Sequence, residues 1–150
     1  MATGIYIGVT SEVPKYETTT STSTTNITSD TLSTYFSISG SSGYYPYGSI
    51  FELVGYEDET TYCYYVCKKE GSYTFNWTVS SEESYDVFSV TLNNSTIVNQ
   101  VSGETSGSFT KNLVVGDKLN FLFSKDGSVD EGDDTCTWTI SAKITTTTQT

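Results

Sequence analysis

The chain has 150 residues, a length typical of one domain with its own hydrophobic core, and its twelve Tyr and seven Phe among abundant Thr and Ser favour β-sheet over helix. Its seven basic residues are all Lys and its net charge at pH 7 is −11, so we expect it to bind neither nucleic acid nor an anionic membrane surface, since both would repel it. The sequence contains no His, the side chain used most often for proton transfer near neutral pH and in catalytic zinc sites, and we therefore predict that the protein is not an enzyme.

Residues 1–30 predict an arm that lies outside the main domain. Residues 4–9 form a short apolar segment that resembles a β-strand, and Pro14 ends it because proline cannot donate a ladder hydrogen bond. Residues 18–25 are all Thr or Ser and lack the apolar side chains that offset the entropy of ordering, so we interpret them as a linker or as an extended strand on a partner. The first nine residues lack the basic and continuous apolar regions of a secretion signal. We assign residues 31–150 to a single folded domain.

From residue 35 onward, apolar and polar residues alternate in short runs that clusters of Gly, Asn, Asp and Ser separate, which is the signal for antiparallel strands. The clearest run is residues 73–79, whose one face carries Tyr73, Phe75, Trp77 and Val79. We predict further strands at residues 50–56, 62–67, 88–92, 96–101, 108–114, 119–123 and 136–144, with turns at residues 93–94 and 116–117. About eight or nine strands with one apolar face each predict an all-β fold, a two-sheet antiparallel β-sandwich of the jelly-roll kind.

The three cysteines predict buried free thiols, as in a protein made in a reducing cytoplasm. Cys63 and Cys67 lie in one predicted strand, where their Cα atoms would be roughly 13 Å apart and too distant for a disulfide. Pairing of Cys136 with either of them is the alternative.

Acidic residues gather in two predicted loops, residues 82–86 and residues 126–134. Calcium takes six to eight oxygen ligands at roughly 2.3–2.6 Å, which two neighbouring carboxylate-rich loops can supply. The candidate calcium ligands are Glu82, Asp86, Asp126, Asp130 and Asp133. Two alternatives stay open: a solvated turn in which Lys125 pairs with a carboxylate, and an acid–base pair for glycoside hydrolysis, whose required separation the spacing does not fix.

Tyrosines cluster in residues 43–48 and again at residues 62–65. Aromatic rings beside polar groups stack on sugar faces and also anchor protein interfaces. We take Tyr44, Tyr45 and Tyr47 as candidate glycan contacts. The alternative is that these rings cover the edges of the sandwich.

One resemblance lies in the opening phrase, Gly4-Ile5-Tyr6-Ile7-Gly8-Val9, which is similar to the start of tail and other structural proteins from phages and prophages of Gram-positive bacteria. The resemblance implies a virion protein that assembles in the cytoplasm of a bacterial host. Because the segment is short, apolar and rich in β-formers, it could dock by adding a strand to a partner sheet. The candidate docking residues are Ile5, Tyr6, Ile7 and Val9.

A second resemblance extends from Trp77 to Trp138, nearly half of the chain, and is carried mainly by two phrases, residues 81–90 and residues 125–134. They are similar to a β-sandwich module of bacterial surface proteins and phage structural proteins, related to the extracellular MAM-type jelly roll. The resemblance implies an adhesive or carbohydrate-facing sandwich without catalytic residues. Its motif positions here are Glu82, Asp86, Lys125, Asp126 and Asp133. We expect the two loops to meet at one end of the sandwich, where Lys125 would neutralise part of the carboxylate cluster.

These features together predict a virion structural protein, a capsid decoration or head-fibre protein or a tail-associated one. The arm would dock on other capsid or tail proteins, and the sandwich would project in many copies towards a host-surface glycan. The alternative is a carbohydrate-binding module, free or displayed on a bacterial surface, in which Ca²⁺ bridges to the sugar. A third reading, a secreted adhesin fragment, needs an export signal that the sequence does not show.

Overall fold

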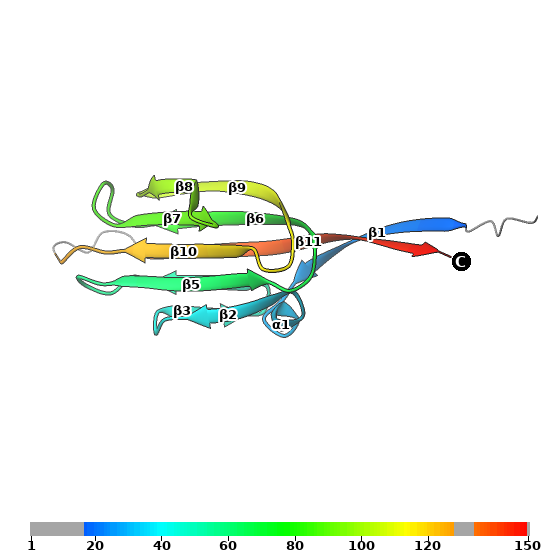
Figure 1. Ribbon diagram of the computed structural model, residues 1–150. Helices are drawn as coiled ribbons and strands as arrows, with labels where there is room; N and C mark the ends of the chain where they lie inside the picture. Colours follow the sequence, from blue (N-terminus) through cyan, green and yellow to red (C-terminus); the bar gives the residue numbers. More distant parts are fainter. Residues whose placement is uncertain (1–16, 128–133, 150) are drawn as a thin grey trace, which may run out of the picture.

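The computed structural model describes residues 17–127 and 134–149, which form two antiparallel β-sheets packed face to face (Figure 1). The predicted all-β, two-sheet antiparallel sandwich is therefore confirmed. The expected strand at residues 4–9 and the docking residues Ile5, Tyr6, Ile7 and Val9 lie outside the described residues.

One sheet has six strands, in the order β3-β4-β11-β6-β9, with β1 added to β11. These strands are β1 (Thr18–Ile27), β3 (Tyr44–Tyr47), β4 (Ile50–Val54), β6 (Gly71–Ser80), β9 (Glu104–Leu113) and β11 (Thr135–Gln149). The other sheet has five strands, in the order β2-β5-β10-β7-β8. They are β2 (Phe36–Gly40), β5 (Thr60–Cys67), β7 (Val87–Leu92), β8 (Ser95–Val101) and β10 (Lys118–Ser124).

The core lies between the sheets because alternate residues of each strand point inward. In β10, for example, Leu119, Phe121 and Phe123 are buried while the residues between them are not. Phe121 stacks on Trp138 of the opposite sheet with ring centroids 4.4 Å apart and an interplanar angle of 14°. Aromatic pairs of this kind join the two layers and stabilise them beyond the area they bury.

Left-handed backbone appears at the predicted turns. Asn93 and Asn94, which join β7 to β8, have φ angles of 49° and 71°, as in the two-residue hairpin turns whose twist matches that of the strands. Gly116, in the turn before β10, has a φ of 97°, a conformation that glycine adopts without a Cβ penalty. Both predicted turns are confirmed.

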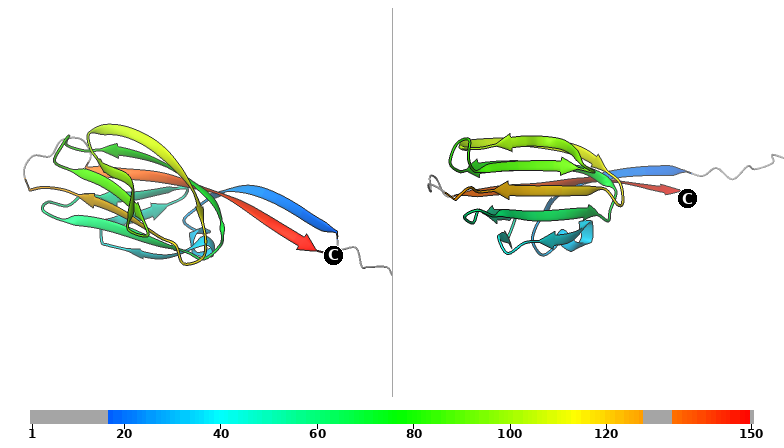
Figure 2. Two further views of the ribbon diagram at one scale, coloured as in Figure 1. Left: turned by 45° about the horizontal axis from the view of Figure 1, so that its top comes forward. Right: turned by 60° about the vertical axis from the view of Figure 1, so that its left-hand side comes forward.

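Strand β1 is the part of the fold that the sequence described least well. Residues 18–25, interpreted as a linker or as a strand on a partner, are extended, and their partner is β11 of the same chain, from Thr18 opposite Gln149 to Ile27 opposite Ile140. The side chains of these residues are exposed on both faces of the strand, so they show no alternation of apolar and polar residues. Ile27, at the end of the strand, is fully buried. The far halves of β1 and β11 extend together beyond the end of the sandwich (Figure 2).

All three cysteines are buried and free, which confirms the expected thiols. Cys63 and Cys67 lie on the inner face of β5, and Cys136 lies on the inner face of β11. Burial raises the pKa of the Cys63 thiol to about 12.

Helix is almost absent from the described part of the chain, where the one assigned helix is α1 (Leu32–Tyr35), a single turn before β2. Among these residues no helix has the length and apolar character needed to span a bilayer.

Candidate functional site

The outer face of the five-stranded sheet carries an aromatic pair on β5. Tyr62 and Tyr64 alternate along β5 with the buried Cys63 and Tyr65, so their rings project away from the core. The two rings stack with centroids 4.5 Å apart and an interplanar angle of 18°. Lys118 of β10 places its Nζ 4.6 Å from the centroid of the Tyr64 ring, a cation–π contact. This pair lies on β5, next to the central strand β10 of the sheet.

Polar side chains continue this aromatic pair across the sheet. The strand registers place Ser39 and Asn120 on either side of Tyr64, and Thr91 beyond Asn120. These four side chains form a row across four strands, about 14 Å long at the usual strand spacing. The buried Oδ1 of Asn120 has no hydrogen-bond partner among the described residues. The row therefore combines a ring, two hydroxyls and an amide with unused hydrogen-bonding capacity.

The three tyrosines predicted as glycan contacts divide between the core and the surface. Tyr44 hydrogen-bonds through its hydroxyl to the Tyr65 hydroxyl at 2.9 Å, and burial raises its pKa. Tyr45 and Tyr47 are 46% and 49% exposed on the edge strand β3, which pairs with β4 in the other sheet. The Tyr45 hydroxyl lies 2.9 Å from that of Tyr56. Two of the three are thus open to a ligand, on a different surface from Tyr62 and Tyr64.

The acidic end of the sandwich brings two loops together, as the sequence predicts. Glu82 and Asp86 flank the turn between β6 and β7, which is closed by a hydrogen bond of 3.1 Å from the Asp86 N–H to the Glu82 carbonyl. Asp126 follows β10, and its backbone N–H donates to Asp86 Oδ1 at 3.1 Å. One carboxylate oxygen from each of these three residues lies within 4.8 Å of the other two.

Further charges surround these three carboxylates. Lys125, only 7% exposed, places its Nζ 3.8 Å from Asp134 Oδ2. A Cβ added to Gly127 would lie 2.6 Å from the carboxylate oxygens of Asp58, so that carboxylate lies against the chain just after Asp126. Two unit charges 4.8 Å apart repel each other by about 3.5 kcal/mol at an effective dielectric constant of about 20. The acidic end therefore concentrates negative charge that Lys125 offsets only in part.

The structure reassigns part of the predicted calcium site. Glu82, Asp86 and Asp126 do come together, whereas Asp130 and Asp133 lie outside the described residues. Asp134, which the sequence places in the acidic loop without assigning it as a ligand, is 8% exposed and contacts Lys125.

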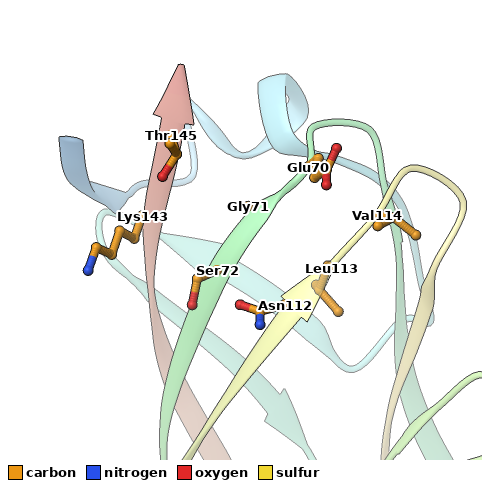
Figure 3. Close-up of a pocket in the computed structure, with 8 residues that line it drawn as sticks. All are labelled: Glu70, Gly71, Ser72, Asn112, Leu113, Val114, Lys143 and Thr145. Carbon is orange, nitrogen blue, oxygen red and sulfur yellow. The ribbon is translucent and has the colours of Figure 1, made fainter. Parts of the chain in front are cut away.

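A hollow of about 530 Å³ lies at the opposite end of the sandwich, where β1 and β11 leave it (Figure 3). Its walls come from the starts of β6 and the ends of β9 and β11, and Ser72 faces Asn112 across neighbouring strands. It is lined by Glu70, Gly71, Ser72, Asn112, Leu113, Val114, Lys143 and Thr145. These groups can bind polar molecules, but the hollow has neither the aromatic rings nor the buried carboxylates of the other two surfaces.

The sequence identified Tyr62 and Tyr64 as part of a tyrosine-rich segment, but it did not predict which side chains of other strands lie beside them. Their spacing of two places them on one strand face. Lys118, Asn120 and Thr91 become their neighbours only through pairing with strands far away in the sequence.

Comparison with known proteins supports the fold. No protein-family model and no curated protein matches the chain. The secreted serine protease VesC from Vibrio cholerae superposes with a TM-score of 0.56 at 14% identity, over 83% of this chain and 28% of that protein. Two structures of family 29 carbohydrate-binding modules, one of them a point mutant, give TM-scores of 0.46 and 0.43 at 12% identity, over 82% and 85% of this chain and 92% and 89% of theirs. This chain spans little more than a quarter of VesC, and the likeness extends to the β-sandwich fold alone.

Proposed function

We propose that this protein is a non-catalytic binding module that takes a neutral glycan along the outer face of its five-stranded sheet. The stacked pair of Tyr62 and Tyr64 beside Lys118 carries the proposal. The apolar face of a sugar ring packs on an aromatic ring, while hydroxyls and amides nearby bond to the sugar hydroxyls and fix its orientation. Asn120 and Thr91 supply such groups next to the rings.

The charge of the molecule favours a neutral ligand over an acidic one. A net charge of −11 repels an anionic polysaccharide at long range. The positive charge of Lys118 is already engaged in a cation–π contact with the Tyr64 ring.

The acidic end supports binding rather than glycoside hydrolysis. Hydrolysis requires two carboxyl groups that face each other across an open cleft, about 5–5.5 Å or about 6.5–9.5 Å apart. Asp86 is fully buried and Glu82 is 9% exposed, so a polysaccharide does not reach them in this arrangement.

Two matched double variants test the proposal. Replacing Tyr62 and Tyr64 by Ala should weaken binding about tenfold or more, because each ring contributes on the order of 1 kcal/mol or more to stacking. Replacing Tyr45 and Tyr47 by Ala removes the same chemistry from the other sheet and should leave the affinity unchanged. The probes are neutral glucans, mannans, galactans and xylans, screened by affinity electrophoresis and then measured by calorimetry.

The two variants also identify the outcomes that would contradict the proposal. Loss of binding in the Tyr45 and Tyr47 variant alone would move the glycan site to the edge strand β3. Absence of binding to every neutral polysaccharide by the unmodified protein would remove the proposed function.

The virion role predicted from the sequence stays a separate proposal. Its docking residues, Ile5, Tyr6, Ile7 and Val9, lie outside the described residues, and the matched proteins above are a protease and carbohydrate-binding modules. The sheet face proposed for glycan binding would serve adhesion on a particle as well as in a free module.

A further inference from the structure

The acidic end contains a buried carboxylate oxygen that has no hydrogen-bond partner among the described residues. The Asp86 side chain is fully buried, and its Oδ1 accepts a hydrogen bond from the Asp126 N–H. Its Oδ2 has no hydrogen-bond partner within residues 17–127 and 134–149. A buried carboxylate oxygen without a donor is costly unless the group is neutralised or binds a cation.

The Asp86 side chain belongs to a group of three carboxylates. Glu82, Asp86 and Asp126 each place one oxygen within 4.8 Å of the other two. They come from two segments, the turn between β6 and β7 and the end of β10, which the Asp126–Asp86 hydrogen bond holds together. The geometry therefore exists without the ion, so a cation would not have to gather its ligands from distant positions.

The local excess of negative charge also favours the binding of a cation. The Nζ of Lys125 lies at this end, 3.8 Å from Asp134 Oδ2. The trio and Asp134 together bring four carboxyl groups to this end of the sandwich.

We propose that Glu82, Asp86 and Asp126 bind a calcium ion that ties the β6–β7 turn to the end of β10. Hard carboxylate oxygens suit Ca²⁺ and Mg²⁺ rather than the softer transition metals. Calcium fits better, because it accepts the irregular geometry of two loops and completes its shell with backbone carbonyls and water, whereas Mg²⁺ demands a near-ideal octahedron. The ion would stabilise the end of the sandwich opposite the β1–β11 extension.

Terbium and calcium titrations of the full chain test the site. After removal of metals with EDTA, Tb³⁺ should bind saturably and emit on excitation of the aromatic side chains, and Ca²⁺ should displace it while Mg²⁺ at the same concentration should not. Calcium at a concentration of about 100 Kd should raise the thermal unfolding midpoint by about 5–10 °C relative to EDTA.

Three variants distinguish a specific site from general attraction of cations. Asp86→Asn and Asp126→Asn should each weaken calcium binding about tenfold or more, because each removes one charged ligand. Asp126 is only partly buried, so its variant keeps the test valid if Asp86→Asn does not fold. Glu57→Gln removes one exposed carboxylate from the neighbouring β4–β5 loop and should leave the affinity unchanged.

Either of two results would overturn the proposal. One is an unmodified chain that neither binds Tb³⁺ saturably nor changes its unfolding midpoint with millimolar calcium. The other is a folded Asp126→Asn protein that binds calcium as tightly as Glu57→Gln does.

Discussion

The hydroxyl of Tyr65 shows how this aromatic core accommodates polar atoms. It accepts a hydrogen bond from Trp138 Nε1–H at 3.2 Å and lies 2.9 Å from the Tyr44 hydroxyl. Burial raises the pKa of Tyr65, and the nearby Cys63 and Tyr44 raise it further. The core thus keeps its phenols and thiols protonated, and the hydrogen bonds of Tyr65 to Tyr44 and Trp138 connect the two sheets.

This arrangement predicts a loss of stability at alkaline pH. The Cys63 thiol has a pKa of about 12 in the folded protein against an ordinary value of 9.0. Between these values the unfolded chain releases a proton that the folded protein retains, so the free energy of unfolding falls by about 1.4 kcal/mol per pH unit for this group. The pKa of Cys136 is also raised from 9.0, so this thiol adds to the decline from the same pH, and Tyr65 adds to it above its ordinary value of 10.0.

Urea unfolding at pH 8, 9.5 and 10.5 measures this decline. The stabilisation should be fully present below pH 9 and should fall steadily above it. A Cys63→Ala variant should show a shallower decline, since it lacks one of the titrating groups. A free energy of unfolding that stays constant up to pH 10.5 would show that these groups remain accessible to water.

Among the strands, those with alternating apolar residues were predictable and those without them were not. Strands β4 to β7, β10 and the first half of β11 coincide with runs that alternate in the sequence, because one face of each is buried in the core, whereas β8 and β9 each contain a single buried residue, Val98 and Leu113. By contrast β1, β2 and β3 have mostly exposed side chains and depend on backbone pairing with β11, β5 and β4. Their existence follows from partners far away in the sequence, which local periodicity does not reveal.

The candidate sites divide in the same way. The meeting of Glu82, Asp86 and Asp126 was predictable, since both segments are loops at strand ends and both belong to the phrases that resemble one β-sandwich module. The row beside Tyr64 was not, because Asn120 and Lys118 reach it only through the register between β10 and β5. The separation of Tyr44 from Tyr45 follows from strand alternation once β3 is known to be a strand.

The outer part of the β1–β11 pair should contribute little to stability. Residues 18–22 pair with residues 145–149, and their side chains are exposed, with contacts such as Thr22 Oγ1 to Thr145 Oγ1 at 3.2 Å. A two-stranded ribbon without a covered face is marginally stable in water. Deleting residues 1–22 and 145–150 should therefore shift the thermal unfolding midpoint by less than about 3 °C.

Ile27→Ala provides the contrast within the same strand. Its side chain is fully buried, so truncation should lower the free energy of unfolding by about 2–4 kcal/mol. Circular dichroism melts of both proteins make the comparison. A large loss of stability in the deletion alone would show that the ribbon stabilises the sandwich through contacts other than pairing.

For the molecule as a whole, the last strand is the one on which the larger sheet depends. β11 pairs with β1, β4 and β6, and it carries Cys136, Trp138, Ile140 and Ala142 into the core. Its partners are separated from it by much of the chain, and non-local pairing of this kind slows folding. The sandwich therefore cannot close until the C-terminal strand is present.

A chain that ends at residue 134 should consequently fail to fold. We expect it to lack the near-ultraviolet dichroism of ordered aromatic side chains, whereas the full chain should refold from urea in milliseconds to seconds. Stopped-flow fluorescence of the full chain and dichroism of the truncated one provide the measurements. Native-like dichroism in the truncated chain would assign the organising role to another strand.

The antiparallel register of β1 and β11 sets Thr18 beside Gln149. Polypeptide fused before Thr18 and polypeptide fused after Gln149 would emerge side by side, at the end of the sandwich opposite Glu82, Asp86 and Asp126. The domain can therefore be inserted into a surface loop of another protein through two adjacent connections, which leaves the outer faces of both sheets exposed.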